Sequence, residues 1–165
     1  MRKPNLFIRP AVAEDLPGVI DLWTELMDFH RDIDPLFTRS AEAADNFLRY
    51  MNENLDSDDS ELFVAELSGS LAGYVLANVS RYPPVFVQER YGAISDAAVA
   101  AAFRRQGIGE ALVNAAAQWF MEKGLNRMEM RLLNANPVSA AFWKKMGFNP
   151  YMTTLFKDIP KTETT

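Results

Sequence analysis

The segment of the sequence most suited to chemistry joins a strand-like stretch to a helix-like one. It contains two arginines and two glycines and reads Val99-Ala100-Ala101-Ala102-Phe103-Arg104-Arg105-Gln106-Gly107-Ile108-Gly109. Glycine lets the backbone approach a ligand closely, and the start of a helix offers free N–H groups at the positive end of the helix dipole. Phosphate groups bind at such junctions. A glycine turn chosen for helix packing is the other interpretation.

The spacing of the glycines excludes two common kinds of phosphate-binding site. The segment lacks the Gly-x-Gly-x-x-Gly pattern of dinucleotide-binding folds and the Lys-Ser/Thr ending of a P-loop. The pyrophosphate predicted here therefore belongs to another kind of ligand.

Two separated motifs resemble those of the GCN5-related N-acetyltransferase (GNAT) family. Arg104-x-x-Gly107-x-Gly109 matches the acyl-CoA loop of that family. The segment from Asn136 to Phe148, with Ser139, Phe142-Trp143 and Gly147-Phe148, resembles the family's Asn-x-x-Ala-x-x-Leu-Tyr-Glu-Lys-Leu-Gly-Phe ending. The resemblance covers about residues 6 to 156. It implies the α+β GNAT fold: a mixed, mostly antiparallel sheet with helices on both faces and a splayed cleft that binds acyl-CoA.

The resemblance assigns cofactor-binding roles residue by residue. Backbone groups of Val99 and Ala101 would hold the thioester carbonyl and the pantetheine arm of acetyl-CoA, and Asn136 would hydrogen-bond that arm near its thiol end. Phe142 would line the slot, although ordinary helix packing explains this residue nearly as well. The pyrophosphate would bind Arg104, Arg105, Gln106, Gly107, Ile108 and Gly109. No metal is expected, because the thioester is already activated.

The sequence differs from the family pattern at the positions of the general acid and the general base. The family's tyrosine, which often protonates the departing thiolate, is replaced by Trp143, whose indole N–H has no useful acidity. The remaining donors are Tyr151 or water, or the thiolate leaves unprotonated. Relatives often carry a glutamate on the fourth strand to relay the amine's proton, and the nearest acidic residue in that strand is Asp96. A loop- or cap-stabilising carboxylate is the other interpretation of Asp96.

Two residues are candidates for the acceptor side. His30 lies on the apolar stripe of the first predicted helix, and in this fold it would lie near the acceptor cleft. Asp34, with Asp28 and Asp32 close by, could attract a cationic amine. The alternatives are a packed histidine and solvated carboxylates at a helix end.

The elements that position these residues follow from hydrophobic spacing. Helical spacing predicts helices over 16–30, from Ser40 as N-cap to 51, over 107–123 and over 139–146. Strands are predicted at 6–9, 62–67, 71–77, 92–99, 128–133 and 151–156, with a hairpin turn at 68–70. The order is β-α-α-β-β-β-α-β-α-β, in a single domain over 1–165 with a flexible tail at 159–165.

Composition narrows the function further. Among 165 residues, 17 Lys and Arg stand against 22 Asp and Glu, a net charge of −5, which argues against a nucleic-acid partner. The absence of cysteine excludes disulfides, thiolate metal sites and cysteine nucleophiles. No apolar run is long enough to span a membrane, and no signal peptide is evident, so we expect a cytoplasmic protein without membrane association.

These observations together predict an enzyme. We expect it to transfer an acetyl group from acetyl-CoA to a primary amine of a small molecule, by direct attack in a ternary complex. A protein lysine or N-terminal acetyltransferase acting on a peptide is one alternative, and a catalytically weak acyl-CoA sensor is another. The apolar segments 82–87 and 151–156 also predict a homodimer, as is frequent in the family.

Overall fold

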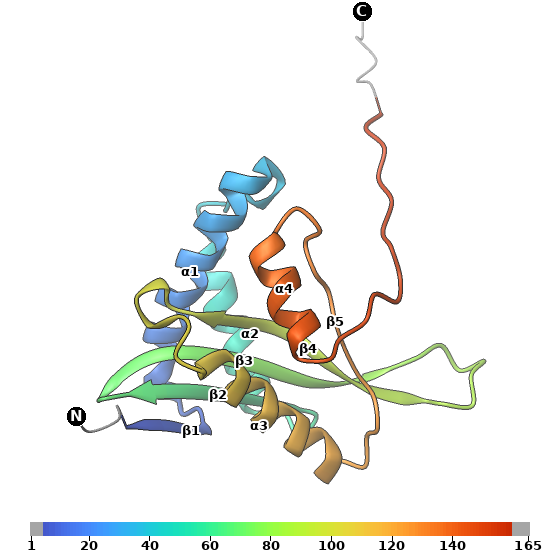
Figure 1. Cartoon of the computed structure of the whole chain (residues 1–165), viewed down its shortest axis with the longest axis horizontal. Helices are drawn as coiled ribbons and strands as arrows, with labels where there is room; N and C mark the ends of the chain where they lie inside the picture. Colours follow the sequence, from blue (N-terminus) through green and yellow to red (C-terminus); the bar gives the residue numbers. More distant parts are fainter. Residues whose placement is uncertain (1–4, 160–165) are drawn as a thin grey trace, which may run out of the picture. The chain divides into compact units, whose positions relative to one another are not determined.

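A computed structural model describes residues 5–159 of the chain (Figure 1). The chain divides between Leu132 and Leu133 into two compact units, which are described separately. Most of the predicted flexible tail, from residue 160 onward, lies outside the described residues.

The first unit is built on a five-stranded sheet with the strands in sequence order. These strands are β1 (Leu6–Pro10), β2 (Ser60–Leu67), β3 (Ser70–Arg81), β4 (Arg90–Val99) and β5 (Met128–Met130). Strands β1 to β4 pair with one another in antiparallel order, and β5 pairs in parallel with β4. Ser68 and Gly69 connect β2 to β3 at φ values of 53° and 86°, as a two-residue type I′ turn requires. The predicted hairpin is confirmed.

Helices cover both faces of this sheet (Figure 1). On one face, α1 (Leu16–Ile33) and α2 (Ala43–Leu55) share a buried cluster with β2 and β3. Its members are Leu16, Val19, Leu22, Phe47, Met51, Leu62, Val64, Tyr74 and Leu76. On the other face, α3 (Ile108–Glu122) lies so close to β4 that a Cβ atom at Gly92 would be 2.6 Å from the ring of Phe120. Gly92 is therefore required by the approach of α3.

Strand β4 has two irregularities that matter for the site. Ala77 pairs with Ile94 but Leu76 pairs with Asp96, so Ser95 is the extra residue of a β-bulge. The pairing of β4 with β5 covers only Gly92 to Ile94, while β4 continues to Val99. The last part of β4 thus has β3 on one side and no strand on the other among the described residues. This is where the GNAT resemblance predicts the splayed strands.

The second unit contains α4 (Pro137–Lys145). Asn136 caps it, since the Asn136 Oδ1 atom accepts a hydrogen bond from the Ser139 N–H at 3.1 Å. Trp143 is buried, and its ring centroid lies 5.0 Å from those of both Phe142 and Phe148 in the same unit. Gly147 ends the segment at a φ of 88°, as predicted.

Three predictions of local structure are wrong. Helix α2 begins at Ala43 with Glu42 as its N-cap, and Ser40 contributes only its backbone carbonyl, which accepts from the Ala43 N–H at 3.3 Å. Strand β5 ends at Met130 rather than at residue 133. The segment 151–156 is not a strand. The prediction failed because the residue pattern indicates only an extended chain, whereas a strand also needs a hydrogen-bonded neighbour.

Candidate functional site

The site predicted from the sequence centres on the connection between β4 and α3. The chain leaves β4 at Val99, forms a short 3-10 helix over Ala101–Phe103 and enters α3 through Gly107 as N-cap. Gly107 has a φ of +80°, and a Cβ atom there would meet nothing within 4 Å. The glycine is therefore required by its backbone conformation rather than by close packing of the helix.

This helix start is open to a ligand. Gly107, Gln106 and the two preceding arginines are exposed, and the Ala111 N–H donates to the Gly107 carbonyl at 3.0 Å. The N–H groups of the first helical turn carry the positive end of the dipole, and Arg104 and Arg105 add two positive charges. Donors and charge of this kind fit the pyrophosphate of a CoA molecule.

The end of β4 has an unexpected partner in α1. One carboxylate oxygen of Glu25 accepts a hydrogen bond from the Ala101 N–H at 2.8 Å and lies 3.8 Å from the Arg104 guanidinium. The Arg104 Nε atom in turn donates to the Val99 carbonyl at 3.2 Å. Two backbone groups that the resemblance assigns to acetyl-CoA are thus occupied by side chains of the protein itself. Glu25 was not predicted as a site residue.

Asp96 lies three residues before Val99 on the same strand and is partly buried. Burial raises the pKa of the Asp96 carboxyl to about 6, and interactions with the Tyr74 hydroxyl and the Ala97 N–H oppose this rise. Burial, together with the carboxylate of Asp96, holds the pKa of Tyr74 well above its usual range. A carboxylate with a pKa near 6 is ionised at neutral pH and still basic enough to accept a proton.

The two acceptor-side candidates each have a structural partner. The ring of His30 is half-buried, with its centroid 5.3 Å from that of Phe37, and burial lowers its pKa. Asp34 caps the 3-10 helix Pro35–Phe37 by accepting the Leu36 N–H at 2.9 Å. Packing and capping therefore account for both residues, and their role in acceptor binding stays a prediction.

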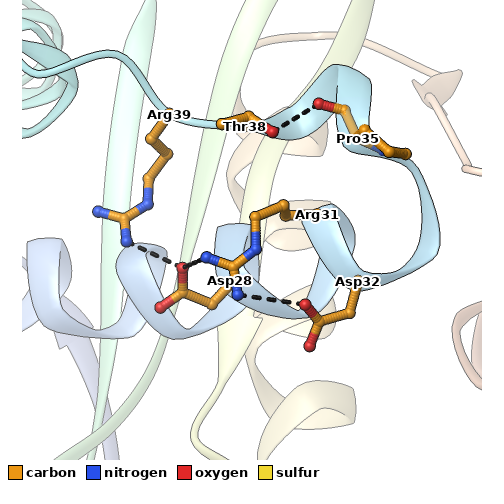
Figure 2. A network of polar contacts seen from close by, with 6 residues as sticks. All are labelled: Asp28, Arg31, Asp32, Pro35, Thr38 and Arg39. Carbon is orange, nitrogen blue, oxygen red and sulfur yellow. Dashed lines mark hydrogen bonds and ion pairs between the residues drawn. The ribbon is translucent and has the colours of Figure 1, made fainter.

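The neighbouring acidic residues are neutralised by arginines (Figure 2). One oxygen of Asp28 accepts from Arg31 at 3.1 Å and from Arg39 at 2.9 Å, and Arg31 also donates to Asp32 at 3.1 Å. Arg39 is the main cause of the lowered pKa of Asp28. This network ties the end of α1 to the loop before α2 and offers a cationic amine little unbalanced charge.

Three predicted site residues belong to the second unit. Asn136 is buried, and its Oδ1 atom accepts the hydrogen bond that caps α4. Phe142 contacts Trp143 edge-on, and Tyr151 is exposed outside any helix or strand. The structure thus brings Val99, Ala101 and Arg104 together with Glu25, while Asn136, Phe142 and Tyr151 are described within their own unit.

The comparisons with known proteins decide the family. The sequence model of the acetyltransferase (GNAT) family matches residues 22–148. The chain belongs to this family. Its members are acyl-CoA-dependent acyltransferases.

Individual relatives of this GNAT protein are distant. It is 24% identical over 141 residues to an uncharacterized N-acetyltransferase of Methanocaldococcus jannaschii, and the match covers 86% of the chain but only 59% of that relative. The BH1408 protein from Bacillus halodurans has the same fold, with a TM-score of 0.82 at 20% identity over 93% of this chain and 99% of that one. So does the aminoglycoside N-acetyltransferase AAC(6')-Iy, solved in complex with CoA, with a TM-score of 0.76 at 20% identity over 96% and 97% of the two chains.

Two other kinds of site do not occur in the part of the chain that the structure describes. No helix in residues 5–159 is both long and apolar enough to cross a membrane. No cluster of three or more His, Cys, Asp or Glu side chains suited to a metal ion occurs within that range either.

Proposed function

We propose that this GNAT protein transfers an acetyl group from acetyl-CoA to a primary amine of a small molecule, by direct attack in a ternary complex. The observation that carries the proposal is the open start of α3, where a glycine at positive φ follows two arginines, next to a β4 strand that continues beyond its pairing with β5. The aminoglycoside acetyltransferase among the structures of the same fold supports a small-molecule acceptor.

Acetyl-CoA would supply an acetyl group that is already activated as a thioester. The N–H groups from Arg104 to Gly109 would hold its pyrophosphate. The backbone of Val99 and Ala101 would hold the pantetheine arm and the thioester carbonyl, and for this Glu25 has to release the Ala101 N–H. A donor at the carbonyl oxygen stabilises the negative charge that develops there during attack.

Asp96 is the proposed base. As the amine nitrogen bonds to the acetyl carbon, Asp96 would take the proton that the nitrogen loses, through a water molecule. Asp96 and Val99 are three positions apart, about 10 Å along the strand, which leaves room for the amine and that water. The carbon–sulfur bond breaks, and the sulfur keeps the electron pair as a thiolate.

The thiolate then needs a proton. Trp143 is buried between Phe142 and Phe148 and its indole has no useful acidity, so we assign this role to Tyr151 or to solvent. A thiolate also leaves readily at neutral pH, and the reaction proceeds, more slowly, without a dedicated acid. Asn136 and Phe142 would contribute to the pantetheine slot.

Two alternative functions, an acyl-CoA sensor and a peptide acetyltransferase, and a homodimeric state also remain as proposals. An acyl-CoA sensor is favoured by Trp143 in place of the family's tyrosine. A peptide acceptor is the alternative to a small molecule within the same chemistry. We further propose a homodimer, because large apolar side chains are exposed at the β3–β4 connection and after α4.

The test is release of free CoA from acetyl-CoA with a panel of polyamines, aminoglycosides, amino acids and lysine-containing peptides. We expect turnover with at least one small amine and a kcat/KM that falls below pH 6, since Asp96 must be ionised to act as base. Asp96→Asn should lower kcat by roughly 10²- to 10⁴-fold and remove the acid limb, with CoA affinity unchanged.

Asp21→Asn, on the exposed side of α1, is the matched control and should leave kcat unchanged. CoA binding without turnover for every amine would establish the sensor instead. Turnover of peptides alone would establish the protein-modifying enzyme.

A further inference from the structure

Tyr74 carries a hydroxyl in a place where a hydroxyl is costly. The residue lies in the middle of β3, is 0% exposed and belongs to the apolar cluster between the sheet and helices α1 and α2. Its Oη atom is buried and makes no hydrogen bond of standard geometry with any described residue. Phenylalanine would fill the same space without burying a polar group, so packing does not explain the hydroxyl.

The register of the sheet places Asp96 beside this hydroxyl. Leu76 is opposite Asp96 and Tyr74 is opposite Ala98, so Tyr74 and Asp96 are diagonal neighbours on the same face of an antiparallel pair. Diagonal neighbours are within reach of an aromatic side chain.

The bulge at Ser95 is what produces this neighbourhood. In an uninterrupted register starting from the pair Ala77 and Ile94, Ser95 would be opposite Leu76, and Asp96 would point to the α3 face. The extra residue turns Asp96 to the face that carries Tyr74 and α1. Bulges near functional sites commonly re-aim a side chain in this way.

The effects of the two groups on each other agree with this geometry. The Tyr74 hydroxyl lowers the pKa of Asp96 against the larger effect of burial, and Asp96 raises the pKa of Tyr74. Both directions are those of a phenol that donates to a carboxylate, since such a bond favours the ionised acid and the protonated phenol.

We propose that Tyr74 is a positioning residue for Asp96: its hydroxyl turns toward the carboxylate, holds it on the α1 side of β4 and favours its ionised form. The proposal rests on the proposed function, in which Asp96 is the base. Tyr74 itself touches neither acetyl-CoA nor amine.

Other charged groups on the neighbouring elements are engaged elsewhere. On α1, Glu25 binds the Ala101 N–H and Asp28 binds two arginines. On β5, Glu129 accepts hydrogen bonds from Tyr82 and from Arg127. The influences identified on the pKa of Asp96 are its burial, Tyr74 and the Ala97 N–H.

The test compares Tyr74→Phe with the parent protein and with Tyr50→Phe, a control on the half-exposed face of α2. The pKa of Asp96 is measured by carbon-detected NMR on the ligand-free protein, with Asp96→Asn used to assign the signal. We expect Tyr74→Phe to raise this pKa by roughly half a unit to one unit, and to move the acid limb of kcat/KM up by the same amount. CoA affinity should stay as in the parent, since Tyr74 touches no part of the proposed CoA site, and Tyr50→Phe should change nothing.

An unchanged Asp96 pKa in Tyr74→Phe would overturn the proposal, even if Asp96→Asn abolishes turnover and the proposed function stands. Conversely, a raised pKa in a protein that acetylates no amine would support the positioning role and refute the proposed function. If Tyr74→Phe does not fold, spectrophotometric titration of Asp96→Asn replaces it. One tyrosine should then titrate at a lower pH than in the parent, and an identical titration curve would overturn the proposal.

Discussion

At the scale of single residues, Gly107 offers the most direct test of the proposed CoA site. A Cβ atom at Gly107 would meet nothing within 4 Å, but a side chain there would stand where the proposed pyrophosphate approaches the backbone. We predict that Gly107→Val lowers CoA affinity by at least tenfold, which corresponds to about 1.4 kcal/mol. Isothermal titration with CoA measures this directly.

Gly69 supplies the matched control. It also has a positive φ, 86°, and a Cβ atom there would meet nothing within 4 Å, but it lies in the β2–β3 turn. Gly69→Val should suffer comparable backbone strain and keep its CoA affinity. Equal losses in the two variants would mean that strain, and not the pyrophosphate site, explains the result.

The residues of the site were predictable where they follow one another along the chain. The loop from Arg104 to Gly109 is a continuous motif, and the structure places it at the start of a helix, as expected. Glu25 and Tyr74 were not predictable. Glu25 contacts Ala101, which is 76 positions away in the sequence. The face of the sheet on which Asp96 lies depends on the bulge at Ser95, which the residue types in β4 do not predict.

At the scale of elements, the connection from β1 to α1 depends on one buried carboxylate. Asp15 accepts two hydrogen bonds from Arg9, at 2.7 and 2.9 Å, and a third from the Val12 N–H at 2.9 Å, and its side chain is only 11% exposed. The Arg9 guanidinium is the main reason that the pKa of Asp15 lies below its usual value. A depressed pKa in the folded state stabilises the protein above the unfolded pKa and loses that contribution as the pH falls through the folded pKa.

We therefore predict that Asp15→Asn lowers the free energy of unfolding by about 1–2 kcal/mol at pH 7, since Arg9 is half-exposed and solvent weakens the pair. The difference from the parent should begin to shrink below about pH 4, near the unfolded pKa, and disappear at still lower pH. Urea unfolding at several pH values measures it. Glu14→Gln, an exposed neighbour, is the control, and a difference that persisted at pH 2 would refute the electrostatic account.

Elements were predictable to the extent that local signals define them. The Ser68-Gly69 turn and the glycines after α3 and α4 fix their ends through positive φ, and the amphipathic stripe fixes the face of α1. The length of β5 and the absence of a strand at 151–156 depend on pairing with distant segments, which hydrophobic spacing does not encode.

At the scale of the whole molecule, large apolar side chains are exposed in two segments of the described chain. The connection from β3 to β4 exposes Val85, Phe86 and Val87, at 79%, 58% and 104%. The segment after α4 exposes a second set: Tyr151, Met152, Leu155, Phe156 and Ile159. Exposed apolar segments are frequent in interaction sites, and the proposed homodimer would cover at least one of these two.

We predict that the protein elutes as a dimer, with a mass by light scattering about twice the 18.6 kDa of the chain, at micromolar concentration. Phe86→Asp should shift this equilibrium toward the monomer, because a charge placed in an apolar interface has to be desolvated without a partner. Leu36→Asp is the control, since Leu36 is also exposed, at 81%, but lies in the 3-10 helix Pro35–Phe37 after α1, outside both segments. CoA affinity should survive in both variants, because Phe86 precedes the start of β4 whereas the loop from Arg104 to Gly109 follows its end.

A parent protein that remains a monomer at high micromolar concentration would refute the dimer. A dimer unaffected by Phe86→Asp would show that the interface does not include the β3–β4 connection.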